Sequence, residues 1–312
     1  MAAPVKPNYT YSGAFDRALF QREFVSQFAK SGRYNPAAMP QLLALLGSIE
    51  RDPAMLDIRW AAYMLATVMW ETTYPTKTQR PALGKKGKPL VDKKGVAIMI
   101  KETKWLMTMR PVDEIGHGKT RDYHEAVKVI RLADGSVHVT EQDGDQFIVT
   151  AAGTFTVLTK GAKVAFPKAH VGNKFEGGGV PGTKDGGVAT ATYDSDAGTE
   201  QAFYGRGYVQ LTWWSNYAKA GASIGRGLDL LLDPELVKDA NVAYALMSHG
   251  MRTGDGFANG HKFSNYFFGS TTHYVGARHM VNGKDHAGDI AAIAEKFEAL
   301  LLKAKLVQSP SP

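Results

Sequence analysis

The sequence predicts a mainly helical domain interrupted by a β-rich insertion, an α+β fold overall. Apolar residues recur at helical spacing near both ends of the chain. Between about residues 126 and 166 the period changes to two, and Asp-Gly pairs separate the alternating runs, as in β-hairpins. With 312 residues, 44% of them hydrophobic, the chain is long enough to bury one large core or two small ones.

Helices are expected at both ends of the sequence. Residues 15–31, 41–50 and 56–73 have helical apolar spacing in the first part, and residues 233–252 and 287–306 have it in the last part. The segment 233–252 begins with an Asp-Pro cap signal. On the third helix Trp60, Met64, Val68 and Glu71 follow at intervals of four, four and three, so an apolar face ends in a carboxylate.

The middle of the chain is interpreted as two insertions. Residues 80–108 are rich in Lys and Gly, with a short helical piece expected over 97–107, and residues 126–195 hold β-rich runs and a Gly-rich loop. Between Lys77 and Lys128 there are thirteen basic and six acidic residues. This excess of positive charge indicates either a binding surface for a polyanion or a solvated loop. We therefore assign 1–79, 109–125 and 196–308 to one discontinuous helical domain, 80–108 to a basic insertion, 126–195 to a β-rich insertion and 309–312 to a tail.

Composition excludes several classes of protein and site. The chain has no cysteine, so disulfides and thiolate metal sites are excluded. No apolar run is long enough to span a bilayer, and the first residues lack the apolar stretch of a secretory signal. The nine His residues have no metal-ligand spacing, and no calcium loop, phosphate loop or nucleophile elbow is complete, so we expect no metal and no cofactor. The net charge of +7 favours a polyanionic partner: nucleic acid, an anionic membrane surface or an acidic wall polymer.

Two carboxylates are candidates for acid–base chemistry. Glu71 ends an apolar helix face, where burial raises a carboxyl pKa and keeps it protonated, as a general acid requires. A glutamate that only borders the core would look the same. Glu114 lies in the turn-rich segment MRPVDEIGHGKTRDY, with two cations and a tyrosine close behind that would keep it ionised. Plain surface charge is the alternative there.

The segment FYGRGYVQLTWWSNY, residues 203–217, has the composition of a binding surface. Gln210, Thr212 and Asn216 supply amide and hydroxyl groups among tyrosines and tryptophans. This combination suits sugars, although aromatic faces also stack nucleobases. Arg206, between two glycines, is expected to brace the loop or a carboxylate.

Four segments resemble, in the same order, the sequence blocks of the family 19 glycoside hydrolases, which comprise chitinases and phage endolysins. The segment YGRGYVQLTWWSNYAKAG resembles the family signature, and LATVMWETT resembles its helix ending in His-Glu-Thr, with Trp70 in place of the His. The segment RPVDEIGHGKTRDY is similar to the family's block with the second acidic residue, and ARHMVNGKDHAGDIAAIAEKF to its closing block.

The resemblance implies a lysozyme-like helical fold with a cleft, and inverting hydrolysis of β-1,4 bonds beside N-acetylglucosamine or N-acetylmuramic acid. It makes Glu71 the general acid, Glu114 the general base and Thr212 a holder of the attacking water, with carboxyls about 6.5–9.5 Å apart. Because 43 positions separate the two glutamates, Glu102 is the alternative base. The resemblance assigns sugar binding to Tyr204, Arg206, Gln210, Asn216, Tyr217, Arg278 and Asn282.

Charge and the missing secretion signals guide the expected substrate. A basic protein favours anionic peptidoglycan over neutral chitin, and secreted chitinases usually carry signal peptides and often disulfides. We therefore expect a bacteriophage-type peptidoglycan hydrolase, either an endolysin or a virion-associated lysozyme. It would be a monomer made in the host cytoplasm and would act on the cell wall from the periplasm or the virion. The alternatives are a chitinase and a non-catalytic saccharide-binding or structural phage protein, whereas nucleic-acid binding and stable membrane insertion are not expected.

Overall fold

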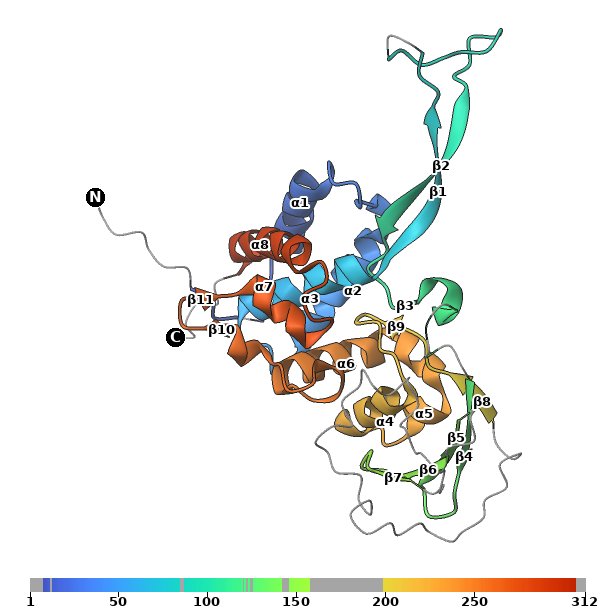
Figure 1. The fold of residues 1–312 in the computed structure, drawn as a ribbon. Helices are drawn as coiled ribbons and strands as arrows, with labels where there is room; N and C mark the ends of the chain where they lie inside the picture. The colour runs from blue at the N-terminus through green and yellow to red at the C-terminus, as the bar shows by residue number, and fades with distance from the viewer. Residues whose placement is uncertain are drawn as a thin grey trace.

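A computed structural model of the chain describes residues 8–306 except 12, 85–86, 120, 122, 124–125, 142–145 and 158–198. Helices and a five-stranded sheet form its body, and one long β-hairpin projects from this body (Figure 1). The expected class, mainly α with a β-rich part, is confirmed. The Gly-rich loop expected at 174–198 lies outside the described residues. Among the helices of the described ranges, none has the length and apolar character needed to cross a membrane.

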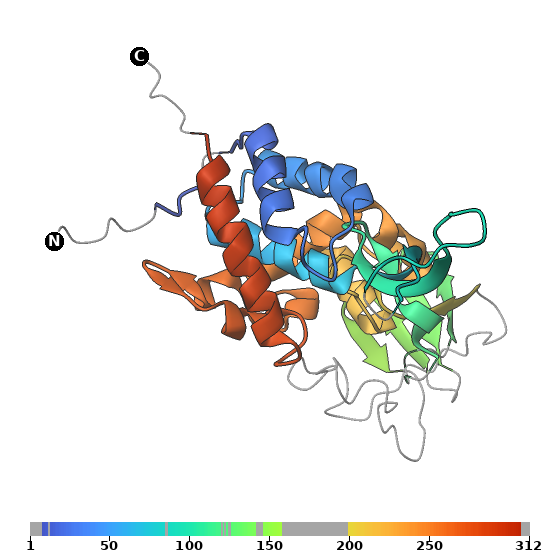
Figure 2. The same cartoon turned by 90° about the horizontal axis from the view of Figure 1, so that it is seen from above.

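Four helices form the larger part of the body: α1 (Arg17–Phe28), α2 (Met39–Arg51), α3 (Ile58–Glu71) and α8 (Ala287–Ala304). All four coincide with the helices expected from apolar spacing. The carboxylates of Asp16 and Asp57 accept backbone N–H groups at the starts of α1 and α3, which fixes where these helices begin. Helix α8 returns from the end of the chain to lie beside α1 and α3 (Figure 2).

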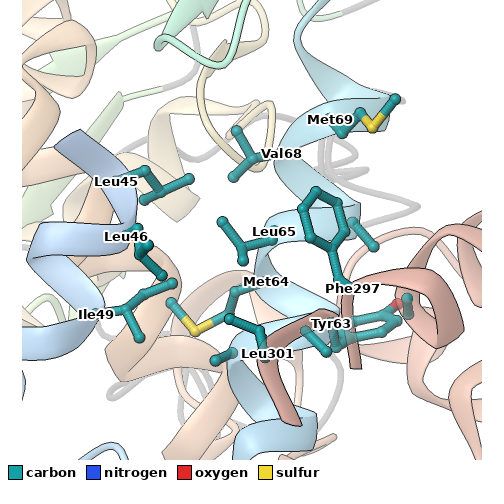
Figure 3. Close-up of a cluster of buried hydrophobic side chains, with 14 of the residues drawn as sticks. Leu45, Leu46, Ile49, Tyr63, Met64, Leu65, Val68, Met69, Phe297 and Leu301 are labelled. Carbon is teal, nitrogen blue, oxygen red and sulfur yellow. The ribbon is translucent and has the colours of Figure 1, made fainter. Parts of the chain in front are cut away.

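Helix α3 is the centre of the larger hydrophobic core. Its residues from Ala61 to Met69 are all buried, since α2 and α8 cover it from different sides (Figure 3). Phe297 of α8 also packs against Phe24 and Phe28 of α1, with ring centroids 5.8 and 5.1 Å apart. A helix buried all round must be apolar on every face, and the polar Glu71 is its last residue.

The helix expected over 233–252 is divided in two. A 3₁₀ helix spans Pro234–Lys238 and α6 spans Ala240–Thr253, each capped by its own aspartate. Asp233 accepts the N–H of Glu235, and Asp239 accepts those of Asn241 and Val242, so the second aspartate starts a new helix. The remaining short helices are α4 (Trp214–Ser223), α5 (Asp229–Leu232), α7 (Tyr274–Ala277) and 3₁₀ turns at Pro36–Ala38, Ile115–Gly118, Gly256–Ala258, Phe263–Asn265 and Arg278–Met280.

The β-rich part forms an antiparallel sheet in the order β7–β6–β5–β4–β8. Its inner face packs on Trp214 and Tyr217 of α4, so the sheet and this helix share a second core. The period of two expected from residue 126 onward is confirmed within the described residues. Strand β8 comes from beyond the range 126–195 and pairs with the first strand. The strands are β4 (Ala126–Arg131), β5 (Val137–Thr140), β6 (Gln146–Val149), β7 (Phe155–Val157) and β8 (Thr199–Ala202). Two further strands, β10 (Phe267–Phe268) and β11 (Thr271–Thr272), form a small hairpin near α7.

The projecting hairpin consists of β1 (Thr73–Pro81) and β2 (Met99–Met107), paired in register from Thr73↔Met107 to Pro81↔Met99. The helical piece expected over 97–107 is therefore wrong. Local spacing suggested a helix there, but a continuous ladder with β1 makes the segment a strand, and its Ile, Thr and Trp residues suit a strand. Figure 1 shows the hairpin standing away from the body, and Figure 2 views it from above.

Candidate active site

The base of the hairpin brings distant parts of the chain together. The backbone N–H and the hydroxyl of Thr108 both donate to the carbonyl of Thr72, at 3.1 and 2.9 Å. The N–H of Met109 donates to the Thr72 hydroxyl at 3.2 Å. The chain therefore leaves α3 directly after Glu71 and returns to the same point before it reaches Glu114. Most of the 43-position separation between the two glutamates lies in the hairpin.

Glu71 is held by a buried arginine. Arg278 Nη1 donates to Glu71 Oε1 at 2.5 Å, and Arg278 Nε donates to the carbonyl of Asp285 at 2.9 Å. The Arg278 side chain is 1% exposed and that of Glu71 is 14% exposed. Burial raises the pKa of Glu71, and the charge and hydrogen bond of Arg278 offset this only in part. A carboxyl with a raised pKa at the end of a buried helix is suited to donate a proton.

Glu114 is fixed by the segment that carries the binding motif. Strand β3 (Val112–Asp113) pairs with β9 (Arg206–Gly207), and the backbone N–H of Glu114 donates to the carbonyl of Gly205 at 2.6 Å. In return the N–H of Gly205 donates to Glu114 Oε2 at 3.1 Å, while the hydroxyl of Tyr123 donates to Oε1 at 2.7 Å. Burial, and then this hydrogen bond, raise the pKa of Tyr123, so its phenol keeps its proton and remains a donor. Each oxygen of the Glu114 carboxylate thus accepts a hydrogen bond.

The glycines beside Arg206 are explained by close approach. A Cβ on Gly205 would lie 3.0 Å from Gln210 Oε1 and 3.3 Å from Glu114 Oε2. Gly207 has φ +85°, and a Cβ there would lie 2.9 Å from Val237 Cγ1. Gly207 therefore favours glycine because of its positive φ and the close approach of Val237, whereas at Gly205 a Cβ would press on the side chains of Gln210 and Glu114.

Arg206 braces this loop from inside. Its Nε donates to Glu235 at 3.0 Å, and its Nη1 donates to the carbonyl of Ala202 at 2.8 Å and to the hydroxyl of Tyr217 at 3.2 Å. The guanidinium lies 3.6 Å from the centre of the Tyr204 ring. Because Arg206 and Tyr217 are buried, direct contact with a sugar does not fit them, and we assign both a positioning role. Tyr204 is partly exposed.

Four of the predicted binding residues line one pocket of about 420 Å³: Gln210, Thr212, Asn216 and Asn282. His261 and His279 line it as well, although no sequence motif marked them as candidates. The side-chain NH₂ of Gln210 already donates to two backbone carbonyls, of Val112 and Gly207. Gln210 also has φ +53°, a left-handed conformation that costs about 1–3 kcal/mol and often accompanies functional sites.

A second pocket, of about 820 Å³, lies at the base of the hairpin, and its lining includes Trp70 and Thr73, which flank Glu71 in the sequence. Trp70 lines it, with the Arg33 guanidinium 3.8 Å from the centre of its ring and His286 at a ring distance of 4.7 Å. Lys104 and Trp105 of β2 complete the wall. The walls of this pocket come from four distant segments, so no local sequence pattern marks it, and from the sequence Trp70 is only a departure from the family pattern.

Glu102, the alternative base, lies far along the hairpin. It stands opposite Thr78, five residue pairs from the Thr73↔Met107 pair at the base. At a rise of about 3.3 Å per residue, this puts it roughly 16 Å along the strand. Lys104 and Arg80 pair with its carboxylate at 2.8 and 3.0 Å and lower its pKa. Glu102 is thus paired with cations on the hairpin, whereas Glu114 contacts the binding loop at Gly205, and we therefore favour Glu114 as the partner of Glu71.

No metal site emerges from the described part of the chain, where no group of three or more His, Asp and Glu side chains is placed to hold an ion. The chemistry available at this site is that of two carboxylates, hydroxyls and amides. Acid–base hydrolysis needs only such groups.

Comparisons with known proteins agree with this chemistry. Residues 172–283 match the family profile of class I chitinases, glycoside hydrolase family 19. The acidic endochitinase SP2 of Beta vulgaris is 33% identical over 123 residues, which are 36% of this chain and 40% of that protein. The acidic endochitinase pcht28 of Solanum chilense is 43% identical over 60 residues, 19% of this chain and 22% of that protein. The chain thus spans two fifths or less of the length of these relatives. No solved structure matches it significantly.

The matched region of the sequence contains only some of the residues of the candidate site. It contains the loop with Arg206, the pocket residues Gln210, Thr212 and Asn216, and Arg278, which holds Glu71. The two glutamates themselves lie before it in the sequence. Their roles therefore remain predictions based on the motif resemblance and on the geometry described above.

Proposed function

We propose that this chain is a family 19 glycoside hydrolase and that it hydrolyses β-1,4 bonds between N-acetylglucosamine units of chitin-like polysaccharides, because residues 172–283 match that family's profile. The endochitinases among its relatives support this substrate over the peptidoglycan that was expected from the sequence. The observation that carries the proposal is the contact of Glu114 with the binding loop, on the segment that follows the closure of the hairpin directly after Glu71. The hairpin closes between them at Thr72 and Thr108, and the pairing of β3 with β9 fixes Glu114 against the binding loop.

The mechanism follows from the different environments of the two carboxyls. Glu71, with its raised pKa, donates a proton to the glycosidic oxygen as the bond from that oxygen to the anomeric carbon breaks. Glu114 accepts a proton from a water molecule whose oxygen forms the new bond from the opposite face of the ring. Thr212 holds that water. The β-linked substrate therefore gives a product of α configuration.

Substitution of each glutamate tests the assignment. Wild type, Glu71→Gln and Glu114→Gln are incubated with N-acetylglucosamine hexamers, with products identified by mass spectrometry and their anomers by NMR. We expect an α-anomer to form first, and each variant to lose about 10²–10⁴-fold in kcat. Glu102→Gln is the matched control and should keep wild-type turnover. Activity lost in Glu102→Gln but kept in Glu114→Gln would overturn the assignment of the base, and a β-anomer would overturn inversion.

Peptidoglycan is a second candidate substrate, and the pocket at the hairpin base favours it. Arg33, Lys104 and His286 line this pocket beside Trp70. Chitin is uncharged and offers no partner to Arg33 and Lys104, whereas the lactyl and peptide carboxylates of the wall would pair with these two cations. Parallel digestion of peptidoglycan separates the two substrates. New reducing ends from peptidoglycan that depend on Arg33 would support the wall polymer, and cleavage of chitin alone would exclude it.

A further inference from the structure

The hairpin, residues 73–107, contains the entire net charge of the protein. Nine of the 37 Lys and Arg residues lie in it, but only two of the 30 Asp and Glu residues do. The hairpin therefore carries +7, and the remainder of the chain, with 28 residues of each sign, is neutral. The proposed glycosidase chemistry uses none of this charge beyond the base of the hairpin.

The same hairpin exposes an unusual amount of apolar surface. Of the large hydrophobic side chains that are exposed among the described residues, more than half belong to it. Val96 and Leu83, for example, are 60% and 54% exposed. Aliphatic side chains in water cost free energy unless a partner covers them. The exposed set is Leu83, Leu90, Val91, Val96, Ile98, Met99, Ile100 and Trp105.

The end of the hairpin is ordered by its own backbone. The N–H of Ala82 donates to the carbonyl of Ile98, that of Ile98 to Leu90 and that of Leu90 to Ala82, at 2.7, 2.8 and 2.7 Å. These hydrogen bonds form a closed ring among three segments. One turn beyond the ring contains Lys93, Lys94 and Gly95, and the N–H of Gly95 donates to the carbonyl of Asp92 at 3.0 Å. Both lysines are exposed, so they lie on the same tip as the exposed aliphatic residues; Figure 1 shows the backbone of this tip.

We propose that this hairpin binds peripherally to lipid bilayers that contain anionic headgroups. Lysines are attracted to such headgroups, and the aliphatic side chains enter the boundary between headgroups and acyl chains. Long lysine stems allow both contacts at one place. The proposal is independent of the glycosidase function, because a bilayer contains no glycan substrate.

Charge and apolarity together favour a bilayer over other occupants. A soluble polyanion such as nucleic acid would pair with the lysines but leave the aliphatic residues uncovered. A second copy of the chain would bring one +7 hairpin against another. Neutral chitin would use neither the charge nor the aliphatic groups.

Vesicle sedimentation with the full-length protein tests the proposal. Vesicles of phosphatidylcholine alone are compared with an equimolar mixture of phosphatidylcholine and phosphatidylglycerol, at low and physiological salt. We expect binding only to the mixture, weakened by salt. Lys93→Gln/Lys94→Gln should lower the affinity about thirtyfold, since each lysine near such a surface contributes roughly a factor of five. Lys262→Gln/Lys296→Gln, which removes two exposed lysines elsewhere, is the matched control.

A second pair of variants tests the apolar contribution. Val96→Ser/Ile98→Ser should weaken binding to the mixed vesicles even where salt has screened the charges, whereas Leu56→Ser/Val275→Ser, exposed residues of the body, should not. All four double variants should cleave N-acetylglucosamine oligomers as wild type does. Equal binding to both vesicle types, unchanged binding in the hairpin variants, or binding of duplex DNA without vesicle binding would overturn the proposal.

Discussion

Arg278 and Glu71, 207 positions apart, form a buried ion pair in which Nη1 and Oε1 are 2.5 Å apart. Arg278 lowers the pKa of Glu71 while burial raises it, and burial prevails. Glu71 must be protonated to act as the acid, so the rate should fall at alkaline pH as Glu71 loses its proton. This fall is the alkaline limb of the pH–rate profile.

Replacement of Arg278 should shift that limb. In Arg278→Gln the cation is lost, the pKa of Glu71 rises further, and activity should persist to higher pH than in wild type, although kcat falls. Arg278→Lys retains the charge and should keep the wild-type limb. The measurement is kcat/KM on N-acetylglucosamine hexamers across pH. A limb that moves to lower pH in Arg278→Gln would contradict the assignment of Glu71.

The raised pKa of Glu71 also predicts how stability depends on pH. A carboxyl whose folded pKa lies above its unfolded value favours folding most at pH below both values. Its contribution is lost as pH rises from the ordinary glutamate range through the raised folded value. In wild type the free energy of unfolding should therefore decrease as pH rises through this window, and in Glu71→Gln this decrease should be absent. Urea denaturation at several pH values measures the difference. An unchanged pH dependence would show that Glu71 is not the group responsible.

Gly205 should be essential for placing Glu114. A Cβ at this position would press against Gln210 Oε1 and Glu114 Oε2. We expect Gly205→Ala to fold but to lose about 10²-fold in kcat, because small displacements of catalytic groups have effects of that size. Gly288→Ala is the control, since nothing lies within 4 Å of a Cβ there. Wild-type kcat in Gly205→Ala would mean that Glu114 does not need its present position.

The hairpin tip should be removable without damage to the site. Arg80 and Ile100 are cross-strand partners, so a two-residue Asn-Gly turn can join them and replace residues 81–99. We expect this variant to keep its melting temperature and its turnover of oligosaccharides, because Thr72 and Thr108 still close the base. Binding to anionic vesicles should be lost. Loss of turnover at an unchanged melting temperature would show that the tip contributes to catalysis.

Phe297 should be among the most important residues for stability. It is fully buried between α8, α1 and α3 and contacts Phe24 and Phe28. Phe297→Ala should lower the free energy of unfolding by about 3–5 kcal/mol, as expected for a large core cavity. Phe268→Ala, at a position that is 56% exposed, should cost far less in the same urea experiment. Equal losses would argue against this core.

The helices could be predicted from sequence because their apolar spacing is local. Helices α1, α2, α3 and α8 lie where the period of 3.6 placed them. Strand β2 could not, because pairing with β1 rather than its own pattern makes it a strand. The sequence named Glu71 and Glu114 as candidates, but their placement depends on the closure at Thr72 and on the backbone hydrogen bond from Glu114 to Gly205, 91 positions away. Contacts between segments so far apart in the sequence leave no pattern in either segment. The buried partners of Arg206 could not be predicted for the same reason.

The distribution of charge gives the molecule a direction. With +7 on a projecting hairpin and a neutral body, the protein is a strong electric dipole whose positive end is the hairpin. A negatively charged surface therefore rotates the molecule as well as attracting it. The protein approaches such a surface with the hairpin foremost. The body then arrives in one orientation instead of a random one, and added salt would remove this alignment before it affected the chemistry of the buried carboxyl.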